Sequence, residues 1–105
     1  MTTQTKSKWP RKVPVLKASD ICKGRLSGPN GTHCLIGWVY ETFNDYSARM
    51  KVRDEIKVEI EVAGYGQTSN IENFNDDKET PKKHIALVWN SAMKSLGYTE
   101  IHDVK

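Results

Sequence analysis

An uncharged stretch over residues 34–40 places the strongest constraint on how this chain folds. At helical periodicity its apolar side chains cover most of the circumference, and Phe43 continues the same surface. An element that is apolar on most sides has to be buried on most sides, so we expect a helix at the centre of a small core. Gly37 weakens this helix by up to about 1 kcal/mol relative to alanine, which indicates that another element crosses close to it.

Length and composition predict one globular domain. The chain has 105 residues, of which 37% are hydrophobic and 28% charged, and natural domains peak near roughly 100–150 residues. No apolar run approaches the ~18–20 residues of a membrane span, and residues 1–6 lack the apolar core of a signal peptide. We therefore expect a cytoplasmic protein with no membrane association. Cys22 and Cys34 are expected to be free, buried thiols in that setting.

Apolar periodicity predicts a mainly α fold, a single compact domain of about four helices. The expected helices cover residues 16–23, 33–43, 47–63 and 81–96. The last of them is the clearest, because Pro81 is typical of a first helical position and Gly97 of a helix end. The expected caps are Thr32 before the second helix, Asp45 or Ser47 before the third, and Thr80 before the fourth.

The third helix has an alternative reading. Apolar residues at positions 56, 58, 60 and 62 alternate with charged ones, which is the pattern of a strand. The apolar residues at positions 48, 52, 56 and 60 also fall on one i, i+4 row of a helix. The helix is favoured because an uninterrupted segment of 16 residues (48–63) is long for a strand. A strand over residues 56–62 would make the fold α+β, and this alternative stays open.

Two segments are expected to be loops. Residues 25–32 contain two glycines, a proline and an asparagine, and residues 65–80 are rich in Gly, Asn, Asp and Ser. Ile71 and Phe74 are expected to pin the second loop to the core.

The N-terminal segment separates from the rest by charge. Residues 1–14 are expected to form an extended arm, since Pro10 and Pro14 oppose a helix, and residues 15–105 form the globular domain. Residues 1–25 carry seven basic side chains and one acidic, a balance of +6, while the other 80 residues carry nine basic and twelve acidic, a balance of −3. A basic arm with a tryptophan can contact phosphates and stack on a base. The candidate binding residues are Lys6, Lys8, Trp9, Arg11, Lys12, Lys17, Lys23 and Arg25.

No metal or cofactor site is expected. Zinc sites need paired ligands at short spacing, whereas Cys22 and Cys34 stand twelve residues apart and His84 and His102 eighteen. Residues 73–79 resemble a calcium loop in their alternating oxygen-bearing side chains, but a lysine and a histidine occupy the positions that require glycine and glutamate. These Asn and Asp side chains are expected to bond nearby backbone amides instead.

The sequence also gives no catalytic constellation. His33 is next to Cys34 along the chain, and neighbours on a helix point about 100° apart, so His33 cannot act as the base for this thiol. The only acid–base candidates that could be nominated are Asp76, Asp77 and His33. We therefore expect a protein that is not an enzyme.

Three motifs resemble a group of small uncharacterised bacterial and phage domains. They are Gly31-x-x-Cys34-Leu35-Ile36-Gly37, then Ile71-x-x-Phe74-Asn75-Asp76 followed by Thr80, and an amphipathic helix ending near Gly97-Tyr98. This chain has Phe74 where that group has tryptophan. The resemblance implies a compact, mostly helical domain in a phage or prophage setting, with no established activity. It implies that Cys34, Gly37, Asn75 and Asp76 hold the fold, through a buried Asn–Asp pair that ties a loop to helix ends.

These observations favour a small, non-enzymatic accessory protein that binds a host protein. The alternative is an accessory protein that binds nucleic acid through the basic arm. The sequence does not define the oligomeric state.

Overall fold

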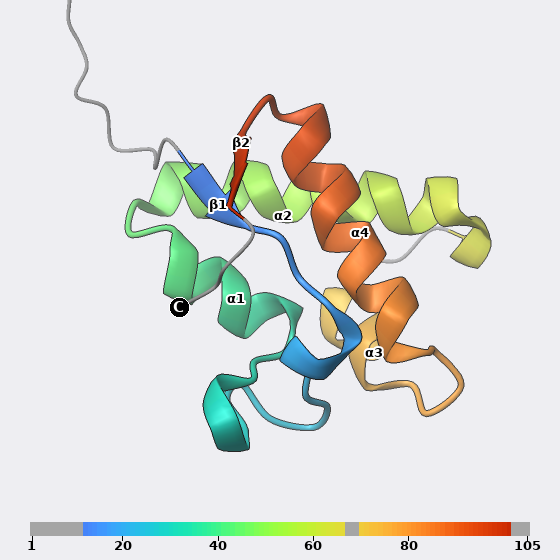
Figure 1. Cartoon of the computed structure of the whole chain (residues 1–105). Coiled ribbons are helices and arrows are strands. Elements are labelled where there is room, and N and C mark those ends of the chain that lie inside the picture. Colours follow the sequence, from blue (N-terminus) through green and yellow to red (C-terminus); the bar gives the residue numbers. More distant parts are fainter. Residues whose placement is uncertain (1–11, 67–69, 102–105) are drawn as a thin grey trace, which may run out of the picture.

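The chain folds as a mainly α, single domain, in agreement with the expected class (Figure 1). The structure, a computed structural model, describes residues 12–66 and 70–101. The candidate residues Lys6, Lys8, Trp9 and Arg11 lie outside this part. Its elements, with η for a 3-10 or π turn, are β1 (Lys12–Pro14), η2 (Ala18–Asp20), η3 (Pro29–Gly31), α1 (Leu35–Thr42), α2 (Tyr46–Ile60), η4 (Glu61–Tyr65), α3 (Ile71–Asp76), α4 (Lys82–Ser95) and β2 (Thr99–Ile101).

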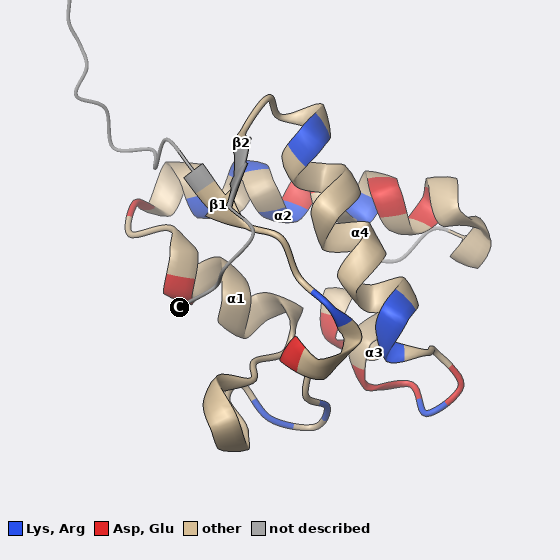
Figure 2. Cartoon of the chain, in the orientation of Figure 1, with Lys and Arg blue, Asp and Glu red and all other residues tan. Residues whose placement is uncertain are grey.

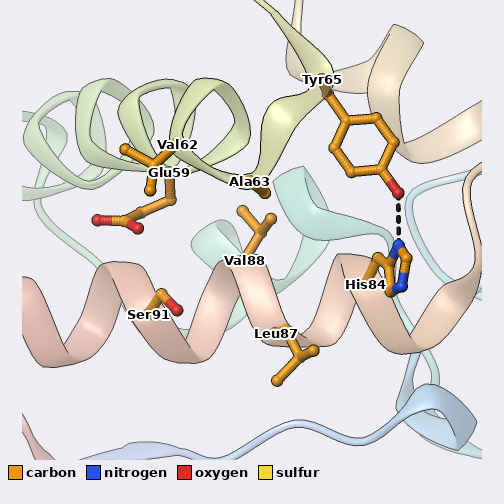
Figure 3. A pocket seen from close by; sticks show the side chains of 8 residues that line it. All are labelled: Glu59, Val62, Ala63, Tyr65, His84, Leu87, Val88 and Ser91. Atoms are coloured by element: carbon orange, nitrogen blue, oxygen red, sulfur yellow. Dashed lines mark hydrogen bonds between the residues drawn. The ribbon is translucent and has the colours of Figure 1, made fainter.

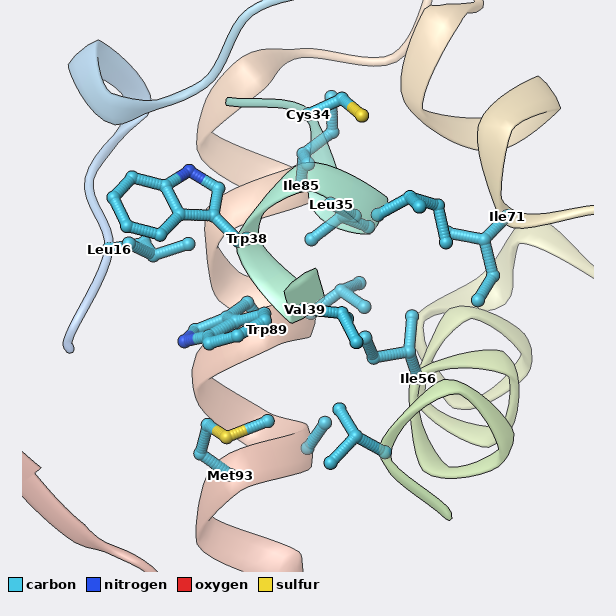
Figure 4. Close-up of a cluster of buried hydrophobic side chains, with 14 of the residues drawn as sticks. Leu16, Cys34, Leu35, Trp38, Val39, Ile56, Ile71, Ile85, Trp89 and Met93 are labelled. Carbon is cyan, nitrogen blue, oxygen red and sulfur yellow. The ribbon is translucent and has the colours of Figure 1, made fainter. Parts of the chain in front are cut away.

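Helix α1 lies at the centre of the core, as the uncharged stretch predicts. Figure 4 shows it between α4 on one side and α2 on the other, with its side chains directed at both. Leu35, Trp38 and Val39 are buried against Trp89 of α4 and Ile56 of α2. The helix begins after Cys34, whose sulfur accepts the Gly37 N–H at 3.4 Å. The expectation that Thr32 caps this helix is therefore wrong, because the chain turns into the helix two residues later.

Residues 56–62 are not a strand. Helix α2 runs to Ile60 and continues as the π turn η4, so the α+β alternative is excluded. The four apolar residues on the i, i+4 row are fully buried, which explains why the helical period prevails over the alternating one. The buried residues are Ala48, Val52, Ile56 and Ile60. Asp45 caps the helix, since its carboxylate accepts the Ala48 N–H at 3.0 Å.

The expected helix over residues 16–23 is wrong. Only the short turn η2 forms there. Leu16 and Ile21 are buried as expected, but the backbone groups of Leu16 and of the two neighbours of Ile21 bond to distant parts of the chain. The side chain of Asn90 accepts the Leu16 N–H at 2.9 Å and donates to the Leu16 carbonyl at 3.0 Å. On either side of Ile21, the Asp20 carbonyl accepts the His33 N–H and the Cys22 N–H donates to the His33 carbonyl, both at 3.1 Å. These long-range partners replace the i, i+4 bonds of a helix.

The folded domain reaches back to Lys12, three residues before its expected start at residue 15. Strand β1 pairs in parallel with β2, and Lys12 is opposite Thr99. Val13 is only 1% exposed. The Trp89 indole N–H donates to the Pro14 carbonyl at 3.0 Å, which fixes the strand over α4.

Helix α3 forms inside the segment expected to be a loop. Asn70 caps it by accepting the N–H groups of Glu72 and Asn73. Ile71 and Phe74 are buried, as expected for residues that pin this segment to the core.

Helix α4 begins one residue later than expected: Pro81 is its N-cap rather than its first residue. Gly97 then follows its C-terminus with a φ of +86°, a conformation that favours glycine.

The buried amide of Asn75 connects three segments, and its side chain is only 1% exposed. Its Oδ1 accepts the Leu35 N–H at the start of α1, at 3.1 Å. Its Nδ2 donates to the Cys22 carbonyl at 3.0 Å and to Asp76 Oδ1 at 2.9 Å. Asp76 Oδ1 also accepts the Gly24 N–H at 2.8 Å, although the residue as a whole is exposed. The pair thus ties the loop after Cys22 to the ends of two helices.

Replacing this amide should destabilise the domain. Asn75→Ala leaves a buried N–H and a buried carbonyl without partners, at an expected cost of about 2–4 kcal/mol. Urea denaturation followed by circular dichroism measures the change. The matched control is Asn73→Ala, an exposed position on the same helix, for which we expect a change within about 0.5 kcal/mol. Equal losses in both variants would contradict the role given to Asn75.

The structure confirms the prediction that another element crosses close to Gly37. A Cβ at this position would overlap the carbonyl oxygen of Leu26, which crosses the first turn of α1. We expect Gly37→Ala to lower the free energy of unfolding by about 1–3 kcal/mol, although alanine is the better helix former. Thermal denaturation checks this. Gly24→Ala is the comparison, because an added Cβ there would have nothing within 4 Å and φ is +79°. It should cost only the backbone strain of a left-handed conformation, about 1–2 kcal/mol.

Candidate functional site

The predicted basic residues do not form one surface in the described part of the chain. Lys17 and Arg25 are exposed on separate loops, before η2 and before η3. For Lys12 the structure describes only the backbone, as the first residue of β1. Figure 2 shows Lys and Arg interspersed with acidic positions over these elements.

Lys23 has a role inside the fold. Its Nζ donates to the carbonyls of Asp77 and Thr80, at 2.5 and 2.6 Å, in the loop between α3 and α4. An ammonium held by two carbonyls stabilises that loop. It is therefore a poorer candidate for a phosphate contact than the sequence suggested.

The residues nominated for catalysis are not assembled into a reactive group. His33 Nδ1 shares a hydrogen bond of 2.9 Å with the Ser27 hydroxyl, and its ring packs edge-on against Trp38. Within the described residues, no group of three or more His, Cys, Asp or Glu side chains could hold a metal ion. Asp77 Oδ1 accepts the Glu79 N–H at 2.8 Å, the kind of local backbone bond expected for this segment.

A polar hollow of about 290 Å³ lies beside Cys34, with Arg25 and Asp76 in its wall. Burial raises the pKa of the Cys34 thiol, which keeps it protonated and a weak nucleophile. Asp76 is already bonded to Gly24 and Asn75. The hollow therefore lies over the bonds that hold the fold, and its residues are committed to them.

A second hollow of about 280 Å³ lies between α2 and α4, and we call it the α2–α4 groove (Figure 3). Figure 3 shows side chains from α2 and η4 on one side of it and from α4 on the other. Its lining residues are Glu59, Val62, Ala63, Tyr65, His84, Leu87, Val88 and Ser91. Most of them are apolar.

Large apolar side chains around this groove are exposed. Val62 is 74% exposed and Leu87 is 58% exposed. Tyr65 closes one end: its hydroxyl shares a hydrogen bond of 2.5 Å with His84 Nδ1, and its ring packs edge-on against Phe74 at 4.9 Å. Apolar surface gathered around a hollow is a common feature of binding sites, whereas single exposed apolar residues need no explanation.

The end of the groove opposite Tyr65 is acidic, because it carries the carboxylate of Glu59 (Figure 3). Glu59 lines it, and the Ser95 hydroxyl of α4 donates to Glu59 Oε2 at 3.0 Å. Glu55 precedes Glu59 by one helical turn. Burial, followed by the hydrogen bond and the charge of Glu59, raises the pKa of Glu55 above its ordinary value of 4.5.

No known protein family matches this chain, and no characterised protein or solved structure is significantly similar to it. None of the helices in the described part of the chain has both the length and the apolar character needed to cross a membrane.

Sequence reasoning missed the α2–α4 groove. The available signal was a pair of apolar residues off the buried faces of their helices. Val62 follows the row that ends at Ile60, and Leu87 lies outside the buried stripe of α4. Only the positions of the two helices show that they flank one hollow.

The raised pKa of Glu55 has a consequence for stability. The charged form is less favourable in the folded chain, so its cost is present above the folded pKa and absent below the ordinary value of 4.5. Glu55→Gln should therefore raise the free energy of unfolding by about 0.2–0.5 kcal/mol at neutral pH, the usual size of a like-charge i, i+4 repulsion. The gain should vanish in thermal melts below pH 4.5. A gain that persists there would have another cause.

Proposed function

We propose that this chain is a non-enzymatic accessory protein that binds a partner protein through the α2–α4 groove. The occupant is a segment of the partner that presents an apolar side chain to the groove. The observation that carries the proposal is the exposure of Val62 and Leu87 beside a hollow lined by Ala63 and Val88.

The size of the groove favours a side chain as occupant over a cofactor. Pockets for small molecules usually measure about 300–1,000 Å³ and enclose their ligand, whereas this groove lies at the lower end of that range and is walled by helices on two sides only. Protein interfaces commonly depend on a few apolar anchors seated in such hollows. A host protein as the partner is the expectation from the sequence, and this proposal keeps it.

The charge of the groove supports the same proposal. Glu59 at one end of the groove, with Glu55 beside it one helical turn earlier, opposes the approach of phosphate groups, whether from a nucleic acid or from an anionic lipid surface. Nucleic-acid binding through the basic arm would use a different surface and is therefore a separable outcome of the test.

Capture from a host lysate, with and without nuclease, compares the wild-type chain with two variants of the same chemistry. Leu87→Ser removes an anchor in the groove, and Leu26→Ser removes a leucine of similar exposure, 50%, on a distant loop. If Leu87 is a hot-spot residue, its loss costs about 2 kcal/mol, or about 30-fold in affinity. We expect a protein that the Leu26→Ser chain retains and the Leu87→Ser chain loses.

Three outcomes would contradict the proposal. Equal capture by both variants means that binding occurs elsewhere, and capture that nuclease abolishes means that the ligand is nucleic acid. A dimer of this chain, detected by light scattering and lost in Leu87→Ser, would make a second copy the occupant. Circular dichroism of both variants ensures that a loss reflects binding and not unfolding.

A further inference from the structure

The carboxylate of Glu59 at one end of the α2–α4 groove bears on the charge of the ligand that the groove can bind. Glu59 is held in place from the opposite wall by the Ser95 hydroxyl, at 3.0 Å. A carboxylate that is fixed before binding loses little conformational freedom when a ligand pairs with it. The groove thus offers an oriented anionic group next to its apolar surface.

A second carboxylate stands beside the first. Glu55 and Glu59 are four residues apart on α2, a spacing at which side chains are neighbours and like charges repel. The pKa of Glu55 is raised chiefly by burial, and the hydrogen bond and the charge of Glu59 add to this effect. A cation placed between the two carboxylates would remove this repulsion, so this end of the groove favours a basic group over a neutral or acidic one.

The apolar and acidic parts of the groove lie one helical turn apart. Glu59 is three residues before Val62 and four before Ala63, and such positions are about 5–6 Å apart on a helix. An occupant helix has the same spacing between its own residues i and i+3 or i+4. A leucine at one of these positions and a lysine or arginine at the other would meet both parts together.

We propose that the occupant is an amphipathic helix of the partner protein, in which an apolar anchor is followed or preceded, three or four residues away, by a lysine or arginine that pairs with Glu55 and Glu59. This inference rests on the proposed function and adds the charge and spacing of the ligand. Two facing helices accept a third helix as an apolar ridge between them.

The test selects ligands from a surface-displayed library of random short peptides. Wild-type chain is the bait, and the affinity of each selected peptide is then measured for the wild-type and the Leu87→Ser chains. The expected pool carries an apolar residue with Lys or Arg at the spacing given above. Glu55→Gln and Glu59→Gln should each weaken the selected peptides by about 2- to 5-fold, the range of a partly exposed ion pair. The loss should shrink at high salt.

Glu72→Gln is the matched control, because Glu72 is an exposed glutamate on α3 that lines the other hollow. It should leave affinity unchanged. Selected peptides that require Leu87 but are neutral or acidic would overturn the charge inference and leave the proposed function standing. Peptides that bind the Leu87→Ser chain as well as the wild type would overturn the proposed function itself.

Discussion

The side-chain amide of Asn75 holds the rest of the fold together. An amide can accept and donate at once, and here it accepts from the first turn of α1 and donates to the carbonyl of Cys22. Aspartate has the same shape but no donor when ionised, so it could not satisfy both sides. The loop that the amide closes also carries Lys23, whose ammonium bonds to the carbonyls that follow α3. The core helix can begin where it does because this polar cluster satisfies its N-terminus.

The predictions that succeed are those that rest on local pattern. Helix α4 has an uninterrupted buried stripe, and α1 is apolar around most of its circumference, so no tertiary contact is needed to identify either. The segment from Leu16 to Ile21 fails because its bonds go to Asn90 and His33, far away in sequence. Helix α3 escapes prediction because six residues are too few to show a period. The groove could not be predicted from the sequence either, because it depends on how α2 and α4 are placed relative to each other.

The α2–α4 groove has rigid walls. The inner face of α2 is buried through Ile56 and Ile60, and that of α4 through Ile85 and Trp89, so neither helix can move without disturbing the core. The turn η4, with Gly64 at a φ of +97°, leads to Tyr65 at the end of the groove. A site framed in this way is largely formed before its ligand arrives, and binding there orders little of the protein.

The pairing of β1 with β2 has a consequence for the order of events during synthesis. Val13 needs the cover of a strand that is made more than 80 residues later, and Pro14 needs the indole of Trp89. While the ribosome is still translating α3, the first strand has neither partner. Strand β1 can therefore take its place only after residues 99–101 have been made, so the N-terminal strand is among the last elements to join the fold although it is the first to be synthesised.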